Sequence, residues 1–473
     1  MIITAGQYDS TPVHDLLSAA ARGHVGVDQR LLRSILSRGD EAIEDVVRFG
    51  LEERFDDRIN LDEDLLAIIQ YAASPKAIPY LLDLLKRESA DPPEDLVHAL
   101  QRIGEPAIAP LIALYEELGP EMGSGIAFVI AAFPHRDPAI LKTLRERVSH
   151  DPSDAAFLLG VHGDPAGIPI LRKLKERALV NQDLAESLGN EADEALALLA
   201  GERKEETPEP INLWDLYPEY IEPVFDVMTL EEKLEFLHCP SAELRADCAT
   251  SFIDRDVPSA VRDVLVKLAA GDPNVGVRSV ACTALAGHAD DEKIFGMLLG
   301  KLENSTLPPA ERCGALLGIA AAAKAHPEVK NYIEEFYANP ATTARAMEAM
   351  WRSLDASYAP FFRRHLNDAD IDIRRQAIKG TGFLELSSEA PRLLELMRDD
   401  EFRLDALFSY AMAVPIDRLQ RGDMPQVLKK IENLAGGLSD AEGEVVETAL
   451  DTRLVLHGLE PVFLDYAGEE ENG

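Results

Sequence analysis

The stretch NDADIDIRRQAIKGTGFLELSSEAPRLLELMRDD (367–400) contains the pattern that decides the fold. It consists of an acidic turn, a helical segment that carries Arg374 near its start, a short break, and a second helical segment that begins at Ala390. Apolar and small residues recur three or four positions apart in both segments, which is the spacing of one helix face. A pair of helices this short cannot bury its apolar face alone, so the stretch predicts a stack of repeated pairs.

The arginine of this stretch recurs along the second half of the chain. Steps of 29 to 34 residues separate the members of this arginine ladder, which are Arg245, Arg278, Arg312, Arg345, Arg374 and Arg403. Small residues follow three and six positions later at five of the six sites: Cys248/Ser251, Ala281/Ala284, Ala315/Gly318, Ala377/Gly380 and Ala406/Ser409. After Arg345 the small residues are Ala346 and Ala349, so this repeat is displaced by one position. A face of small side chains predicts that the neighbouring helix comes close.

A second ladder marks the partner helices in the first half of the chain. Its prolines are 31, 32 and 27 residues apart and comprise Pro75, Pro106, Pro138 and Pro165. Proline suits the first turn of a helix, where its missing N–H has no partner within the helix. The two ladders together predict helix pairs over residues 28–200 and 230–460. The fold class that follows is an all-α superhelix of antiparallel helix pairs.

The repeated unit resembles the HEAT repeat, and in particular the HEAT-like repeats of phycobilisome-lyase proteins. The resemblance implies an armadillo-like α-solenoid in which a turn aspartate and a helix arginine bond between successive repeats. Asp272 and Arg278 occupy these positions in one repeat. Asp368 or Asp370 occupies the acidic position in another, with Arg374 as the base. The resemblance therefore implies that the ladder arginines are structural and do not bind a ligand.

The sequence predicts two arrays joined by a linker. The N-terminal array covers residues 1–200. The segment GERKEETPEPIN (201–212) is charged, contains two prolines and has no apolar period, which is typical of a linker. The C-terminal array covers residues 213–466, and the acidic tail 467–473 is predicted to be disordered.

The charge of the chain favours some partners over others. Asp and Glu number 84 against 47 Lys and Arg, which gives a net charge of −37. Nucleic acids and anionic membranes are poor partners, since their phosphates require cations, whereas a basic protein is attracted. The alternative is that the charge keeps a long surface soluble. The sequence contains one cluster of basic residues, and we expect the aspartates within this cluster to neutralise it. Its basic members are Arg363, Arg364, Arg374, Arg375 and Lys379.

The sequence predicts a cytoplasmic protein. The start of the chain has no basic segment followed by an apolar run, so no signal peptide is expected. No apolar stretch reaches the roughly 18 residues of a membrane-spanning helix. The four cysteines, Cys239, Cys248, Cys282 and Cys313, form no CxxC pair and are expected to be reduced and buried.

No motif in the sequence indicates catalysis, a cofactor or a bound metal. Iron-dependent hydroxylases with HEAT-like repeats bind metal through His-Glu pairs, and this chain has none. HExxH and GxSxG are also absent. Asp368, Asp370 and Asp372 imitate the opening of a calcium loop, but Ile373 and Lys379 stand where that loop requires Gly and Glu. We therefore expect no enzyme activity.

The favoured function is a scaffold or adaptor that binds a basic protein on the concave face of the solenoid. Aromatic residues are the candidate contacts, namely Trp214, Tyr217, Tyr220, Trp351, Tyr358, Phe361 and Phe362. The first three lie in LWDLYPEYIEPVFDVM (213–228), which could instead cap the C-terminal array. Two other functions stay open. The resemblance allows a subunit that attaches tetrapyrroles to antenna proteins, and the many carboxylates allow a metal-dependent enzyme of unrecognised type.

Overall fold

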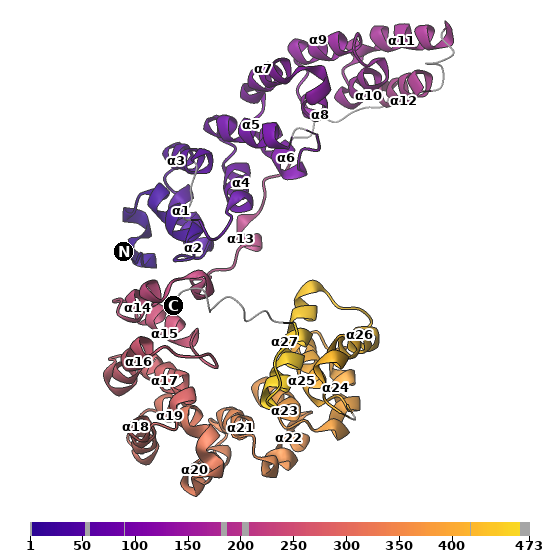
Figure 1. The fold of residues 1–473 in the computed structure, drawn as a ribbon. Coiled ribbons are helices and arrows are strands. Elements are labelled where there is room, and N and C mark those ends of the chain that lie inside the picture. The colour runs from indigo at the N-terminus through magenta and orange to yellow at the C-terminus, as the bar shows by residue number, and fades with distance from the viewer. Residues whose placement is uncertain are drawn as a thin grey trace. The chain divides into compact units, whose positions relative to one another are not determined.

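The structure is a computed structural model that describes residues 2–52, 57–88, 90–180, 187–200, 208–416 and 418–463. Within these residues the regular structure is helical, with no strand, and each helix packs against its neighbours in sequence order. The predicted all-α superhelix of helix pairs is confirmed. The chain divides into two compact units, Met1–Leu230 and Glu231–Gly473 (Figure 1).

The first unit contains two layers of helices (Figure 1). The proline layer contains α3 (Asp40–Leu51), α5 (Ile78–Arg87), α7 (Glu105–Met122), α9 (Pro138–Arg147) and α11 (Ile168–Val180). The opposite layer, which we call the even layer, contains α2 (Gln29–Leu36), α4 (Asp62–Ala72), α6 (Glu94–Ile103), α8 (Ser124–Ala132), α10 (Pro152–His162) and α12 (Ser187–Ala200). The shorter elements are η1 (Ala5–Ser10), α1 (Val13–Ala21), η2 (Pro75–Ala77), η3 (Pro165–Gly167), α13 (Leu213–Leu216) and η4 (Phe225–Val227).

The second unit repeats this arrangement. The ladder arginines lie in the arginine layer, which contains α15 (Ala242–Thr250), α17 (Val275–Ala284), α19 (Pro309–Ile319), α21 (Thr343–Arg352), α23 (Ile371–Phe383), α25 (Arg403–Ala413) and α27 (Asp440–Leu456). Figure 1 shows this layer on the inside of the curve of the unit. Outside lie α14 (Leu230–Leu237), α16 (Ser259–Gly271), α18 (Glu292–Glu303), α20 (Pro327–Tyr337), α22 (Ala359–His365), α24 (Ala390–Leu396) and α26 (Met424–Ala435). Short 3-10 turns join the layers: η5 (Ala286–His288), η6 (Ala320–Lys324), η7 (Ala356–Tyr358), η8 (Ser387–Glu389) and η9 (Arg421–Asp423).

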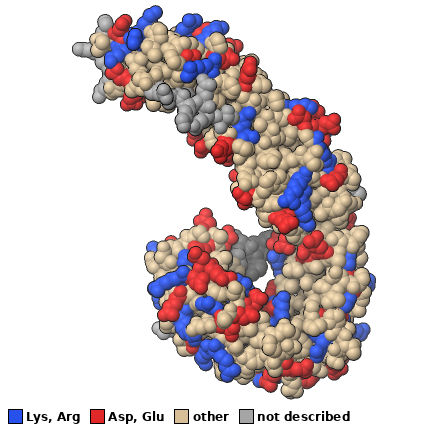
Figure 2. All heavy atoms as spheres, turned by 180° about the vertical axis from the view of Figure 1, so that it is seen from behind, with Lys and Arg blue, Asp and Glu red and all other residues tan. Residues whose placement is uncertain are grey.

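The surface of the molecule mixes the two signs of charge. Figure 2 shows Lys and Arg side chains interspersed with Asp and Glu over both units. Within the described residues, no helix combines the length and the apolar character needed to cross a membrane.

The ladder prolines lie where helices begin, as predicted. Pro75 and Pro165 open the short turns that lead into α5 and α11. Pro106 and Pro138 lie at the first positions of α7 and α9. At these positions a missing N–H costs no helical hydrogen bond, and the fixed backbone angle of proline favours the helix.

Small residues let the helices of the arginine layer approach closely. A Cβ on Gly318 of α19 would lie 2.3 Å from the backbone oxygen of Cys282 on α17, and one on Gly314 would lie 2.2 Å from that of Ser279. A Cβ on Gly380 of α23 would lie 2.2 Å from the ring of Phe362 on α22. Since these distances are too short for any side chain, the predicted close approach is confirmed at Gly318 and Gly380.

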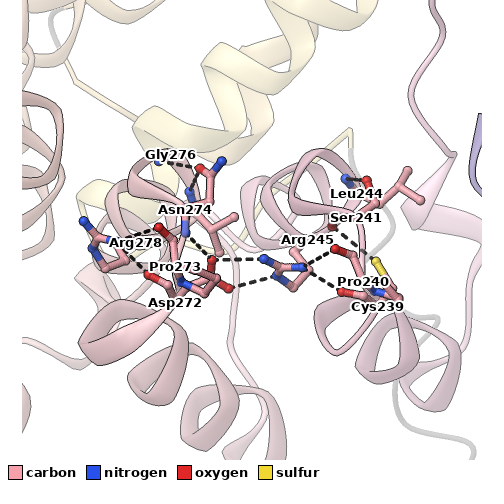
Figure 3. Close-up of polar contacts among 11 residues, drawn as sticks. Cys239, Pro240, Ser241, Leu244, Arg245, Asp272, Pro273, Asn274, Gly276 and Arg278 are labelled. Atoms are coloured by element: carbon pink, nitrogen blue, oxygen red, sulfur yellow. Dashed lines mark hydrogen bonds and ion pairs between the residues drawn. The ribbon is translucent and has the colours of Figure 1, made fainter.

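Arg245 illustrates what the arginine ladder does (Figure 3). Its Nη1 donates to the carbonyl oxygens of Cys239 at 2.8 Å and Pro240 at 2.9 Å, just after α14 ends, where helical carbonyls lack partners. Its Nε and Nη2 donate to the two carboxylate oxygens of Asp272 at 2.9 and 3.0 Å. Arg245 is 8% exposed and Asp272 is 7% exposed, so the pair is buried. One side chain thus connects a helix end, its own helix and the next repeat.

The predicted pairing of Asp272 with Arg278 is wrong. Arg278 donates through Nη1 to the backbone oxygen of Asp272 at 2.6 Å, while the Asp272 carboxylate accepts hydrogen bonds from Arg245. The Nε of Arg278 donates instead to Glu311 in the following repeat at 2.8 Å. A helical side chain points toward the start of its helix, so Arg245 and Arg278 reach the turn that precedes their own helix. The acidic partner of each then comes from the repeat that follows.

The predicted pairing of Arg374 with Asp368 or Asp370 is also wrong. Asp370 caps α23 by accepting hydrogen bonds from backbone N–H groups of the first turn, and Asp368 accepts one from a histidine ring. The Arg374 guanidinium lies 4.2 Å from the centre of the Phe402 ring, and its Nη2 is 3.9 Å from Asp399 in the next repeat. Asp370 of the local turn therefore caps the helix and does not pair with Arg374.

Arg345 departs from the ladder, as its displaced register predicts. It is the third residue of α21, whereas Arg245 and Arg278 are the fourth residues of their helices. Its side chain is 60% exposed and pairs with Glu348 on its own helix at 2.8 Å. Thr342 instead satisfies a carbonyl at the end of α20, because its Oγ1 donates to the backbone oxygen of Phe336 at 2.7 Å.

The boundary between the two units lies later than predicted. The aromatic stretch 213–228 was assigned to the C-terminal array, but it falls within the first unit. Leu213 is buried in the core of that unit, and Trp214 and Tyr217 pack against the same core. Residues 201–207 of the predicted linker and the predicted tail 467–473 lie outside the described residues.

Replacing Gly318 with alanine is expected to destabilise the second unit. The new methyl group has no room between α19 and the backbone of α17, and such overpacking costs about 2 kcal/mol. Gly296→Ala is the matched control, because Gly296 lies within α18 with no atom within 4 Å of a Cβ. That change should stabilise the helix by about 0.5–1 kcal/mol. Urea unfolding followed by circular dichroism measures both, and equal effects would contradict the close approach.

Asp272→Ala is expected to lower the free energy of unfolding of the second unit by about 3 kcal/mol, because Arg245 is left buried without its carboxylate. Arg345→Ala is the control from the same ladder and should cost less than about 1 kcal/mol, since that arginine is exposed. Chemical denaturation of both variants beside the parent gives the comparison. A cost at Arg345 that matches the cost at Asp272 would show that the ladder acts in some other way.

Candidate functional site

Residues 208–228, which we call the strap, run along the even layer of the first unit. Gln29, the first residue of α2, holds the strap by its main chain. Its Nε2 donates to the carbonyl oxygens of Trp214 at 2.8 Å and Tyr217 at 2.7 Å, and its backbone N–H donates to that of Pro218 at 3.0 Å. Further along, the backbone N–H of Val224 donates to a carbonyl in the first unit at 2.8 Å. The even layer therefore binds an extended segment of chain.

The aromatic side chains of the strap pack on this layer. Trp214 meets Tyr71 of α4 edge to face, with ring centres 6.0 Å apart. Tyr220 lies beneath the guanidinium of Arg30, which is 4.0 Å from its ring centre. Both aromatic residues are half-buried. Contacts of this kind anchor the strap, and they leave only part of each ring accessible to another molecule.

A cavity of about 760 Å³ lies between the strap, α4 and α6. Five carboxylates line it, from Asp62, Glu63, Asp64, Glu88 and Asp95. Its apolar wall comes from Leu66, Ala67, Leu84, Pro93, Leu96, Ile211 and Leu216, and its remaining polar residues are Asn60, Gln70 and Tyr217. No Lys, Arg or His is part of the lining, so the cavity combines an apolar wall with uncompensated negative charge.

Within the described residues, no ion pair neutralises the negative charge of the cavity. Across the described residues, none of the five carboxylates forms an ion pair. Asp64 accepts a hydrogen bond from the Tyr217 hydroxyl at 2.8 Å. Burial nevertheless raises the pKa of Asp64, because the Tyr217 hydrogen bond lowers it by less and the neighbouring Glu63 raises it further. Burial also raises the pKa of Tyr217, which therefore stays a neutral donor.

Gln70 on α4 adds an unused polar group to the cavity lining. Its side chain is 5% exposed, and its Oε1 accepts no hydrogen bond within the described structure. A buried amide oxygen without a donor costs roughly 1–3 kcal/mol. Proteins retain such groups mainly where a ligand or a water supplies the missing partner. The oxygen itself is enclosed by the protein, so the five carboxylates, and not this oxygen, indicate a site for a ligand that donates hydrogen bonds.

Four of the residues predicted to contact a partner protein lie in the second unit, and two of them have almost no solvent-exposed surface. Tyr358 is 1% exposed and Phe362 is 0% exposed, so they are core residues and the prediction that they bind a partner is wrong. Phe361 meets Tyr337 edge to face with ring centres 4.9 Å apart. Trp351 stacks on Phe383 at 4.5 Å.

Other predicted features are accounted for by local contacts. Arg363 pairs with Glu389 at 3.1 Å, and Arg375 and Lys379 both approach Asp405, at 2.8 and 3.7 Å. These three cations are paired, but their partners are Glu389 and Asp405 and not the aspartates within the cluster that were predicted to neutralise them. Among the described residues, no group of three or more His, Cys, Asp or Glu could hold a metal ion.

The four cysteines are free thiols and are buried, as expected. Burial raises the pKa of Cys248 and of Cys282 to about 12. Both therefore remain protonated at neutral pH, and a protonated thiol is a poor nucleophile.

Sequence reasoning found one residue of the cavity, Tyr217, and missed the rest. The carboxylates belong to the first turns of α4 and α6 and to the end of α5, and nothing in their spacing sets them apart from the many other acids of the chain. Two signals were present. Three consecutive acids (62–64) open α4, and the strap contains four aromatic residues within 214–225. Comparison of the chain with known protein families and with curated proteins gave no match.

Asp64→Asn is expected to raise the melting temperature of the first unit at pH 7. The pKa of Asp64 is raised in the folded state, so its ionised form destabilises the fold once the pH exceeds that value. Asparagine removes the buried charge and still accepts the hydrogen bond from Tyr217. Thermal unfolding at pH 7 and pH 3.5 measures the effect, which should fade at the lower pH. Glu116→Gln, an exposed change on α7, is the control. A lower melting temperature for Asp64→Asn at pH 7 would contradict this electrostatic assignment.

Proposed function

We propose that this chain is a non-catalytic protein-binding scaffold whose first unit takes a basic, extended segment of a partner protein into the acidic cavity beside α4. The observation that carries the proposal is the set of five carboxylates in one cavity with no cation in its lining. Like charges gathered in this way repel one another, and a cation from outside relieves the repulsion. A volume of about 760 Å³ lies within the range of roughly 300–1,000 Å³ that is usual for ligand sites.

The apolar wall indicates what kind of cation fits. Leu66, Leu84 and Leu96 provide a surface for the methylene groups of a lysine or arginine side chain. The carboxylates then accept hydrogen bonds from its charged end. A bare metal ion fits less well, because the described acids do not converge in a group of three or more that could hold one. This chemistry favours basic side chains.

The strap supports the idea that the ligand is a protein segment. Gln29 already holds the short helix α13 and the residue after it on the even layer through their main-chain carbonyls. Contacts of this kind depend on the backbone and accept many sequences. A partner segment can use the same mode of binding, with its basic side chains in the cavity. The net charge of −37 adds long-range attraction for such a partner.

A fluorescein-labelled decapeptide of alternating arginine and leucine is the probe for this proposal, and one of alternating glutamine and leucine is its neutral control. Fluorescence anisotropy at 0.15 M salt should show binding of the arginine peptide and little binding of the neutral one. The triple change Glu63→Gln, Asp64→Asn and Glu88→Gln should weaken binding about tenfold, on the basis of about 0.5 kcal/mol for each lost ion pair.

The control protein for this experiment neutralises three exposed carboxylates of the second unit, by Asp290→Asn, Glu292→Gln and Glu303→Gln. Its net charge equals that of the cavity variant, so general attraction is matched. Retained binding in the control and lost binding in the cavity variant supports the proposal. Equal loss in both would mean that the peptide responds only to overall charge, and the cavity would then have no role.

A further inference from the structure

A groove of about 390 Å³ lies between α9 and α11 in the proline layer of the first unit, and its charge is opposite to that of the cavity. Arg145, Lys173 and Arg177 line it, and no Asp or Glu does. The other lining residues are Val148, Pro169, Ile170 and Leu174. The groove therefore presents three cations around a mostly apolar floor.

The local composition departs strongly from that of the whole chain. The helices α9 and α11 together contain seven Lys and Arg and two Glu, while the chain has 47 basic and 84 acidic residues. Figure 2 shows Lys and Arg side chains at the end of the first unit where these helices lie, with Asp and Glu side chains among them. This basic groove is not visible in the sequence, because α11 is interrupted by apolar residues and only folding places it beside α9.

The cations of the groove differ from the other basic residues nearby. Lys175 pairs with Asp193, and Arg147 is buried against Asp154. By contrast, Arg145, Lys173 and Arg177 are exposed, and no ion pair joins any of them to a carboxylate of the described chain. In a chain with so many carboxylates, three unpaired neighbouring cations stand out. Their charge is available to a ligand.

We propose that this groove binds an acidic segment of a second protein, one that carries leucine-like side chains between its carboxylates. The cations pair with the carboxylates, while Ile170 and Leu174 bury the apolar side chains. Nucleic acid is a poor occupant, since it offers no apolar side chain and requires a longer basic track. This site is distinct from the acidic cavity, and the inference does not depend on the function proposed for that cavity. With both sites occupied, the chain would bridge two partners of opposite charge.

A fluorescein-labelled decapeptide of alternating glutamate and leucine is the probe for the groove. Anisotropy at 0.15 M salt should show saturable binding, and a glutamate–serine decapeptide should bind at least about fivefold more weakly, because it lacks apolar side chains. The triple change Arg145→Gln, Lys173→Gln and Arg177→Gln should weaken binding of the glutamate–leucine peptide about tenfold. All three residues are exposed, so an unchanged circular dichroism spectrum is expected and confirms that the variant is folded.

The control for this experiment is the triple change Arg418→Gln, Lys429→Gln and Lys430→Gln, which removes three exposed cations from the second unit. It should leave binding unchanged. The inference is overturned if the glutamate–leucine peptide does not bind, or if both triple variants weaken it equally. It is also overturned if single-stranded DNA or phosphatidylserine vesicles bind through the groove more tightly than the peptide. The groove variant should still bind the arginine–leucine peptide, so failure at one site is distinguishable from failure at the other.

Discussion

The stacking of the second unit depends on one arginine that serves three segments at once. The end of every helix leaves carbonyl oxygens without N–H partners, and a solenoid of short helices has many such ends. Arg245 donates to two carbonyl oxygens of the turn between α14 and α15 and also binds the carboxylate of Asp272 in the next repeat. The Arg245 guanidinium is planar and its five N–H donors point in fixed directions, so it holds the buried Asp272 carboxylate in one geometry. This arginine thereby sets how its helix pair packs on the next one.

The partners of the ladder arginines vary from repeat to repeat, and their position on the helix varies too, from the fourth residue at Arg278 to the first at Arg403. Arg278 uses Glu311, which is nearly fully buried and also accepts a hydrogen bond from Lys301. Burial alone would raise the pKa of Glu311, but the hydrogen bonds and charges of the two cations outweigh it and hold that pKa below its usual range. The pair therefore stabilises the unit at neutral pH, and the contribution declines as acid protonates the carboxylate. Where the register moves by one, at Arg345, a threonine satisfies the helix end instead.

Periodicity explains how much of this could be predicted from the sequence. The prolines, the small residues and the arginines recur at repeat spacing because every repeat faces the same packing problem, so the fold and the close approach at Gly318 were predictable. The partner of each arginine was not, because Asp272 is close in sequence to Arg278 and close in space to Arg245. The strap escaped prediction for a related reason. The side-chain amide of Gln29 donates to the backbone oxygen of Trp214, 185 residues away, and a backbone acceptor leaves no pattern in the sequence.

Two sites of opposite charge on a chain of net charge −37 raise the question of how the basic groove can attract an acidic ligand at all. At physiological salt the Debye length is about 8 Å, so charges farther away are largely screened. The field at the groove is then set by Arg145, Lys173 and Arg177, and the acids of distant repeats contribute little. An elongated array separates its charges more than a compact domain of equal size does. Local composition, more than net charge, therefore decides what each part of this surface binds.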